Sequence, residues 1–177
     1  MDSALPEGAP VQMPTVRLEK GPPLQQVQLV SHKLSDFPKR AERALGFVPS
    51  EQVGDCIEGK VLCLTIGQGA WLLCAEDLQQ TLGDLRQEGL TAFDVRDARS
   101  VLRISGPAAA EVLSRATSID WSAAGMSGHR CIVTLFSGVA CVIRLSANKE
   151  YFDIFAPRSY AQSIWEWCAE TIASIND

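Results

Sequence analysis

The chain has two histidines, His32 and His129, and this limits the nucleophilic chemistry that it could perform. A serine or cysteine nucleophile needs a positioned base, which is usually histidine. His129 lies two residues before Cys131, so in a strand both side chains would point to the same side. No G-x-S-x-G turn and no acidic third member accompanies the pair. We therefore interpret His129 as a residue at the end of a loop, and we predict no catalytic residue.

Two glycine-containing segments could present backbone N–H groups to a phosphate. Residues 67–70 are Gly-Gln-Gly-Ala; they lack the third glycine of a dinucleotide-binding loop, and a strand-like run follows where that loop needs a helix. Residues 105–107 are Ser-Gly-Pro, and Pro107 lacks the N–H donor that an anion site would use. We interpret the first segment as a hairpin turn and the second as a helix start. The sequence predicts no cofactor-binding residue.

The cysteines and carboxylates show no spacing typical of a metal centre or an acid–base pair. No two cysteines are separated by two residues, and neither histidine lies at ligand spacing from a cysteine. Asp94 and Asp97 bracket a predicted turn, and no other carboxylate is placed to converge on them. We predict no metal site and expect free cysteines in a reducing cytoplasm. The cysteines are Cys56, Cys63, Cys74, Cys131, Cys141 and Cys168.

Composition and charge argue against nucleic-acid and membrane partners. The 177 residues carry a net charge of −5, and no basic face is evident. The densest basic group is Lys39, Arg40 and Arg43 beside Glu42; a solvated helix face and a phosphate-contacting patch are the two interpretations, and we favour the first. No secretory signal and no run of about 18 apolar residues occurs. We expect a cytoplasmic protein.

The hydrophobic pattern predicts an α+β fold, with one antiparallel sheet and helices packed on a face of it. Strand signals around short polar turns indicate hairpins. One such hairpin is expected to join strands at residues 93–95 and 101–104 through the turn at 96–99. Further strands are predicted at residues 27–30, 61–66, 70–74, 131–136, 139–145 and 151–155, and helices near residues 35–46, 75–89, 105–116 and 159–175.

The first 24 residues differ in composition from the rest of the chain. Five of the nine prolines lie there, large apolar residues are sparse, and no helical or strand period is visible. We expect an extended proline-rich arm at residues 1–24 and a single domain at residues 25–177. A disordered tail and a segment that lies across a partner both fit the arm. In the second case, Pro14, Pro22 and Pro23 are candidate interface residues.

The last predicted helix carries two tryptophans, Trp165 and Trp167. They lie about 200° apart around a helix, so we expect that they cannot easily enter the same core. A tryptophan along the sheet edge is one interpretation. The other, which we favour, is that a tryptophan anchors a subunit interface, where this residue type is enriched. Trp165 and Trp167 are therefore candidate interface residues.

Three segments of the chain resemble the gamma subunit of heterotetrameric sarcosine oxidase. Residues 67–73 are similar to a turn and strand of that family, and residues 93–113, with Ser-Gly-Pro at 105–107, are similar to its central segment. Residues 151–167, which contain Arg-Ser-Tyr-Ala and Trp-Glu-Trp, are similar to its end. The order and spacing of these short motifs make the match specific. It covers residue 62 to the C-terminus, and more weakly residue 27 onward.

The resemblance implies a fold similar to the folate-binding domain of aminomethyltransferases, and a structural role without catalytic residues. In that family's complexes the alpha and beta subunits carry FAD, NAD and covalently attached FMN, and the delta subunit binds zinc. The complex oxidatively demethylates sarcosine or a related N-methyl amine and transfers the one-carbon unit to tetrahydrofolate. The chain would join alpha, beta and delta partners and bind no cofactor itself. It departs from the family pattern at Gln68, Gly69 and Cys168.

A stand-alone folate-binding protein of the aminomethyltransferase type is the alternative function. It would need a deep pocket and an acidic residue that contacts the pterin, and the chain is about half as long as a full aminomethyltransferase. An independent small enzyme is a third hypothesis. It would need a converging nucleophile and base, which the sequence does not indicate.

Overall fold

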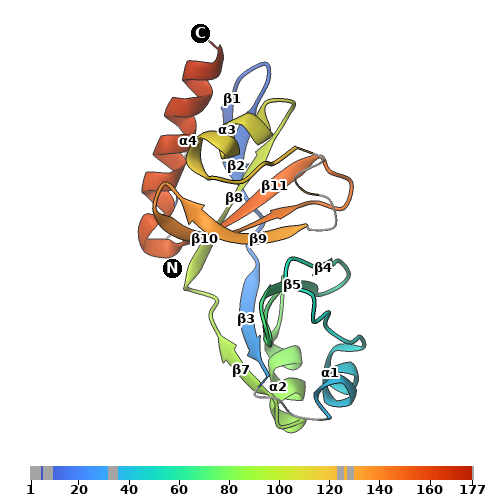
Figure 1. The fold of residues 1–177 in the computed structure, drawn as a ribbon. Helices are drawn as coiled ribbons and strands as arrows, with labels where there is room; N and C mark the ends of the chain where they lie inside the picture. Colours follow the sequence, from blue (N-terminus) through green and yellow to red (C-terminus); the bar gives the residue numbers. More distant parts are fainter. Residues whose placement is uncertain (1–4, 6–9, 32–35, 123–125, 127–129, 177) are drawn as a thin grey trace. The chain divides into compact units, whose positions relative to one another are not determined.

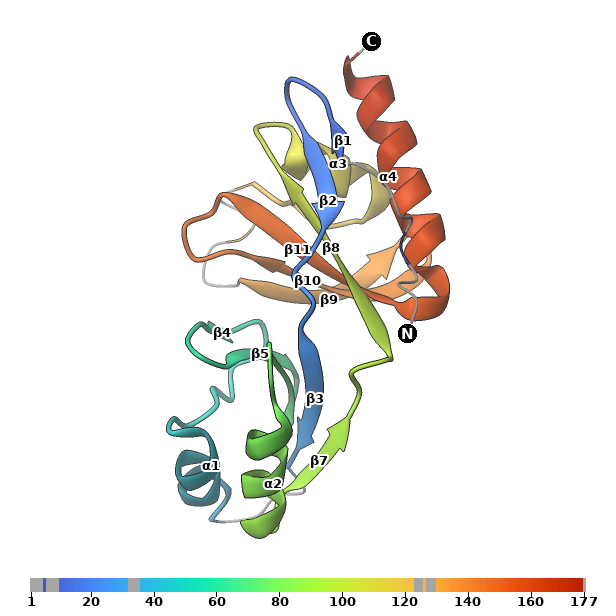
Figure 2. The same cartoon turned by 180° about the vertical axis from the view of Figure 1, so that it is seen from behind.

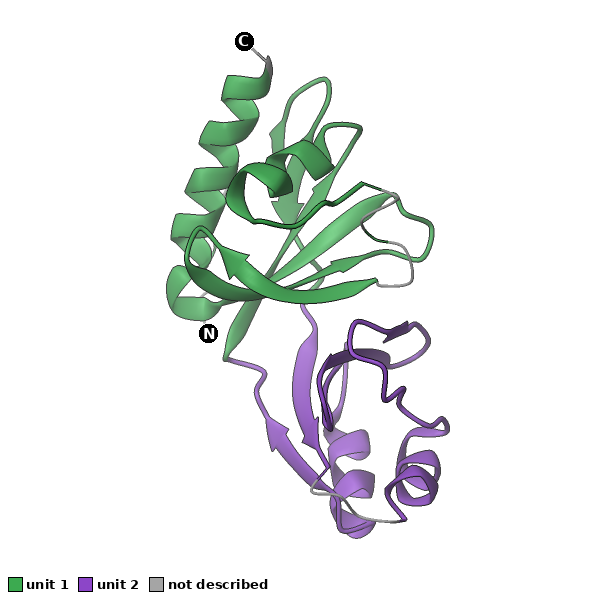
Figure 3. Ribbon diagram, in the orientation of Figure 1, with its two compact units in different colours: residues 1–22, 98–177 green, residues 23–97 purple. Residues whose placement is uncertain are grey.

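The chain forms two compact units in the computed structural model, which describes residues 5, 10–31, 36–122, 126 and 130–176. Unit 1 combines Met1–Pro22 with Ala98–Asp177, and unit 2 is Pro23–Asp97 (Figure 3). This division differs from the expected arm at 1–24 and single domain at 25–177. The reason is that residues 11–12 and 17–20 form strands of unit 1, and each unit has its own sheet.

Unit 1 contains a six-stranded antiparallel sheet in the order β1-β2-β8-β11-β10-β9, with helices on one face (Figures 1 and 2). Both ends of the sequence contribute to it, because β2 pairs with β8 and β8 pairs with β11. Its strands are β1 (Val11–Gln12), β2 (Arg17–Lys20), β8 (Arg99–Ser105), β9 (Cys131–Phe136), β10 (Val139–Leu145) and β11 (Tyr151–Pro157). Its helices are α3 (Ala109–Ala116), the short 3-10 helix η1 (Arg158–Tyr160) and α4 (Ala161–Asn176).

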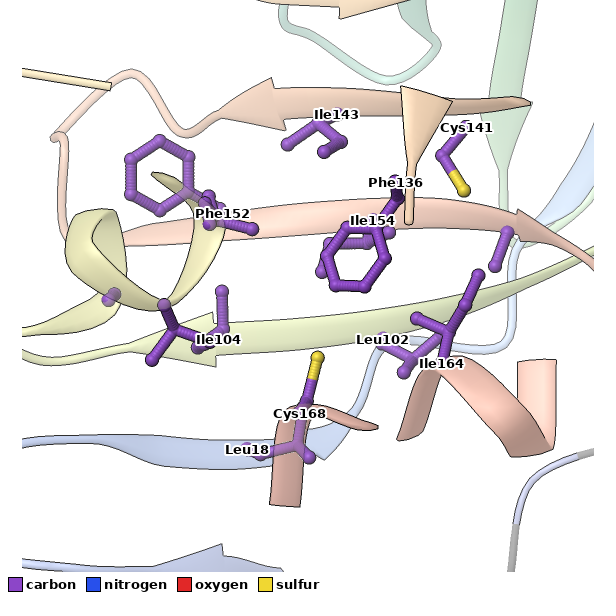
Figure 4. Close-up of a cluster of buried hydrophobic side chains, with 14 of the residues drawn as sticks. Leu18, Leu102, Ile104, Phe136, Cys141, Ile143, Phe152, Ile154, Ile164 and Cys168 are labelled. Atoms are coloured by element: carbon purple, nitrogen blue, oxygen red, sulfur yellow. The ribbon is translucent and has the colours of Figure 1, made fainter. Parts of the chain in front are cut away.

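The core of unit 1 lies between this sheet and its helices. Leu102 and Ile104 of β8 and Ile154 of β11 are fully buried and belong to one apolar cluster with Cys168 of α4 (Figure 4). Leu18 of β2 joins the cluster with 0% of its surface exposed. Burying such a side chain contributes roughly 2 kcal/mol, so this part of the predicted arm is a stabilising component of the fold.

Unit 2 contains a five-stranded antiparallel sheet in the order β4-β5-β6-β3-β7. Phe37, the first residue of α1, stacks on Trp71 of β6, with ring centroids 4.8 Å apart and an interplanar angle of 11°. This stacked pair lies in the apolar core that α1 and α2 share with the sheet. The elements are β3 (Gln25–Val30), α1 (Phe37–Leu45), β4 (Cys56–Ile57), β5 (Leu62–Gly67), β6 (Ala70–Ala75), α2 (Gln79–Gln87) and β7 (Thr91–Asp94).

The structure confirms the α+β class and the antiparallel pairing, but it corrects two predictions. The strands form two sheets rather than one. The hairpin predicted across residues 96–99 is wrong, because β7 pairs with β3 in unit 2, whereas β8 pairs with β2 and β11 in unit 1. Residues 95–98 instead form the linker that connects unit 2 to the second segment of unit 1. The predicted hairpin turn at residues 67–70 is confirmed, since it joins β5 to β6.

The turn after β8 requires glycine at position 106. Gly106 has φ +105°, a region that side chains disfavour, and a Cβ built there would lie 2.5 Å from the carbonyl oxygen of Thr15. We expect Gly106→Ala to lower the free energy of unfolding by roughly 2–4 kcal/mol, because strain and a backbone clash add. Urea unfolding of the purified chain measures this change.

Gly138→Ala is the matched control for that substitution. Gly138 also has a positive φ, +88°, but nothing lies within 4 Å of a Cβ built there. Its replacement should cost only about 1 kcal/mol, which is the backbone strain alone. Equal losses for the two variants would contradict the clash at Gly106.

Candidate functional site

Two buried cysteines of unit 1, Cys141 and Cys168, are held as neutral thiols. Burial raises the pKa of Cys141 to about 11 and that of Cys168 to about 12. The thiolate is the reactive form of cysteine, so these two side chains are inert at neutral pH. None of the six cysteines, all of which lie in the described residues, forms a disulfide, and Cys56 is the one that is not buried. Cys141 of β10 and Cys168 of α4 therefore act as small apolar residues.

Three strands of unit 1 converge on one buried carboxylate, Asp153 of β11, which is 1% exposed. The register places Arg103 of β8 opposite it on one side and Arg144 of β10 on the other. Arg103 donates to Asp153 from Nε at 2.8 Å and from Nη2 at 3.2 Å, and Arg144 donates from Nε at 3.0 Å. Arg103 also lies over the ring of Tyr151, 3.7 Å from its centroid.

The cluster of Asp153, Arg103 and Arg144 has a structural role. Burial alone would lower the pKa of Arg103, but hydrogen bonding to Asp153 and its negative charge outweigh burial and raise that pKa. Arginine stays protonated in proteins, so Asp153 remains paired with two fixed cations. The hydrogen bonds that Asp153 accepts link β8, β10 and β11.

Only some of the other residues considered for chemistry lie within the described part of the chain. His32 and His129 lie outside the described residues, so the pairing of His129 with Cys131 stays a sequence hypothesis. Within the described ranges, no group of three or more histidine, cysteine or acidic side chains could hold a metal ion. In the same ranges, no helix has the length and apolar character needed to cross a membrane. Hydrogen bonds from the Arg96 side chain lower the pKa of Asp94.

Strand β9 presents apolar side chains at an edge of the unit 1 sheet. In the described part of the chain it pairs with β10 alone. Val133 is 50% exposed and Leu135 is 59% exposed, and none of the six residues of β9 is charged. Natural proteins usually protect an edge strand with charges, proline or a bulge, because an open apolar edge is a template for another chain. We take β9 as the candidate interaction surface.

The two tryptophans of α4 both pack against the core of unit 1, so the expectation that they could not is wrong. Trp165 is 7% exposed within the core cluster, and Trp167 is partly buried against it. Trp167 meets Phe136 edge to face, with centroids 5.1 Å apart. Helix α4 touches both α3 and the sheet, so a wide arc of the helix is covered. The interface role of Trp165 and Trp167 stays a prediction; Trp167 is the more exposed candidate and contacts the last residue of β9.

The three candidate prolines lie at two places in the chain. Pro14 is exposed between β1 and β2. Pro22 is the last residue of the first segment of unit 1, and Pro23 is the first residue of unit 2. Their role at an interface also stays a prediction.

Residues 55–174 match the family model described as the sarcosine oxidase gamma subunit family. The chain belongs to this family. That match confirms the family named by the resemblance of residues 67–73, 93–113 and 151–167. No curated protein sequence matches the chain.

Among solved structures, the chain is similar to a heterotetrameric sarcosine oxidase from Corynebacterium sp. U-96, solved in complex with pyrrole 2-carboxylate. The TM-score is 0.81 at 23% sequence identity, over 92% of this chain and 86% of that chain. At this identity the likeness shows the fold. The regulatory subunit of aspartate kinase from Thermus thermophilus has a TM-score of 0.48 at 13% identity, over 88% of this chain and 95% of that chain. That score is too low to carry an argument.

Sequence reasoning did not single out Val133 and Leu135, although β9 contains a usable indication. Apolar residues occupy both parities of the strand, with Ile132 and Phe136 alternating with Val133 and Leu135. Such a run is typical of a strand covered on both faces. The sequence alone does not show that β9 is an edge strand. Its edge position leaves Val133 and Leu135 exposed and available for contact with a partner subunit.

Thiol accessibility gives a direct test of these assignments. At neutral pH we expect one fast equivalent of reaction with a chromogenic disulfide reagent, from Cys56, and slow reaction of the five buried cysteines. At about pH 9 Cys141 and Cys168 should still be protonated and should still react slowly. Cys56→Ser should abolish the fast phase. A fast phase of two or more equivalents would show that a thiol described as buried is accessible.

Proposed function

We propose that this chain is a non-catalytic structural subunit of a heterotetrameric sarcosine oxidase-like complex. Such a complex oxidatively demethylates sarcosine or a related N-methyl amine and transfers the one-carbon unit to tetrahydrofolate. The observation that carries this proposal is the match of residues 55–174 to the gamma subunit family. The likeness in fold to a solved heterotetrameric sarcosine oxidase supports it.

The structural role is supported by how unit 1 uses its reactive groups. Asp153 is paired with Arg103 and Arg144, and the thiols of Cys141 and Cys168 are protonated within the core. Each of these groups contributes packing or strand pairing. The chemistry is therefore assigned to partners: alpha, beta and delta subunits that hold FAD, FMN, NAD, zinc and tetrahydrofolate. The absence of a disulfide among the six cysteines, all of which are described, fits assembly in a reducing cytoplasm.

Recovery of partners from the native cell tests the proposal. A tagged chain expressed from its own locus should co-purify with a large flavin-bearing subunit, and the eluate should reduce an electron acceptor when sarcosine or another N-methyl amine is added. Purification as a flavin-free monomer that binds tetrahydrofolate would overturn the proposal and favour the stand-alone folate-binding function.

The edge strand provides a sharper prediction for the same assembly. We expect Val133→Lys with Leu135→Lys to lower the recovered flavin by at least about tenfold, because two ammonium groups would replace apolar contacts at the interface. Val133 is 50% exposed and Leu135 is 59% exposed, so the fold of unit 1 should tolerate the change. The flavin absorbance per mole of tagged chain is the measurement.

Ser114→Lys with Ser118→Lys serves as the control, since these exposed positions of unit 1 lie outside strand β9 and receive the same added charge. This variant should retain its flavin partner. Thermal unfolding of both double variants separates lost assembly from lost folding. If the β9 variant keeps its full flavin content, β9 is not the interaction surface.

A further inference from the structure

Unit 2 has a groove of about 510 Å³ between the end of α1, the β4–β5 hairpin and the first turns of α2. Its floor is apolar and includes Leu45, Phe47, Ile57 and Val61. Six partly buried apolar residues surround the core of unit 2, and five of them line this groove; Ala92 is the exception. The core of the described unit is therefore least completely covered at this one place.

The rim of the groove is acidic. Glu58, Asp77 and Asp84 line it together with Lys60, which leaves an excess of two negative charges. Asp77 Oδ1 accepts a hydrogen bond from the backbone N–H of Gln79 at 2.9 Å, and Asp84 Oδ1 accepts one from Gln80 Nε2 at 2.7 Å. Within the described residues neither aspartate forms an ion pair. Both aspartates thus accept hydrogen bonds from neutral donors, and both contribute a negative charge to the lining of the groove.

We propose that this groove binds a segment of a partner subunit that presents a large apolar side chain between basic residues. The apolar floor would take the anchoring side chain, as buried anchors do in interfaces. The acidic rim would attract and orient the flanking basic groups. The inference rests on the proposed role of the chain as an assembly subunit, and it adds the chemistry of the contacting segment.

The charge of the chain decides between a partner subunit and a second copy. Each chain carries a net charge of −5, and the groove is itself negative. Two copies would bring like charges together, which opposes association. A basic segment of a different subunit is complementary to the groove in both charge and polarity.

Neutralising the rim tests the proposal in the purified complex. Asp77→Asn with Asp84→Asn keeps an acceptor oxygen for Gln79 and Gln80, so α2 should remain folded. We expect the tagged variant to dissociate from the flavin-bearing partner about three- to tenfold more readily at low ionic strength. The difference from the wild type should shrink in about 0.3 M salt, because salt screens these charges. Size-exclusion chromatography after dilution measures the fraction that dissociates.

Glu42→Gln with Glu51→Gln is the matched control. It removes two exposed carboxylates of unit 2 that do not line the groove, and it should leave dissociation unchanged. A second variant, Ile57→Thr, weakens the floor and should increase dissociation at both salt concentrations. Unfolding curves of all three variants show whether unit 2 remains intact.

The outcomes separate the groove from the proposed function. If the wild type recovers a flavin-bearing partner and the two double variants behave alike, the groove inference is overturned and the proposed function stands. If the wild type recovers no such partner, the proposed function fails, and the inference fails with it. If the isolated chain forms a dimer that Asp77→Asn with Asp84→Asn alters, a second copy occupies the groove and the proposal is wrong.

Discussion

One buried carboxylate, Asp153, fixes the register on which unit 1 depends. It lies between Arg103 and Arg144, so β8, β11 and β10 align in one way only. A slip of one residue would turn these charges toward the helices and move Leu102 and Ile104 out of the core. Removing one partner of a buried ion pair typically costs about 3–5 kcal/mol, a large share of a domain's stability. The packing of α4 against the sheet depends on this alignment.

The sequence predicted the fold class and most strand positions, because hydrophobic alternation is a local property. The arrangement of strands into two sheets was not predictable in the same way. Whether β8 pairs with β7 or with the distant β2 depends on non-local contacts that no local pattern records. Leu18 shows the same limit, since a single buried leucine flanked by charged residues does not indicate a strand.

The candidate surfaces were harder to predict than the family. Short motifs were enough to identify the family, and the match over residues 55–174 confirms it. Trp165 and Trp167 share one core despite their angular separation, because α4 contacts both α3 and the sheet. The edge position of β9 and the apolar groove of unit 2 arise from tertiary structure. Their residues, such as Leu135 and Phe47, look like ordinary core residues in the sequence.

The discontinuity of unit 1 has a consequence for how the protein is made. Unit 2 is one continuous stretch, Pro23–Asp97, so all its strand partners have left the ribosome before β8 appears. Strand β2 must wait for β8, and β8 must wait for β11 near the end of the chain. Domains generally fold as they emerge, so unit 2 can close first while the segment around Leu18 stays unpaired. During synthesis Val16 and Leu18, which are buried in the folded unit, therefore have no strand partner until β8 has emerged.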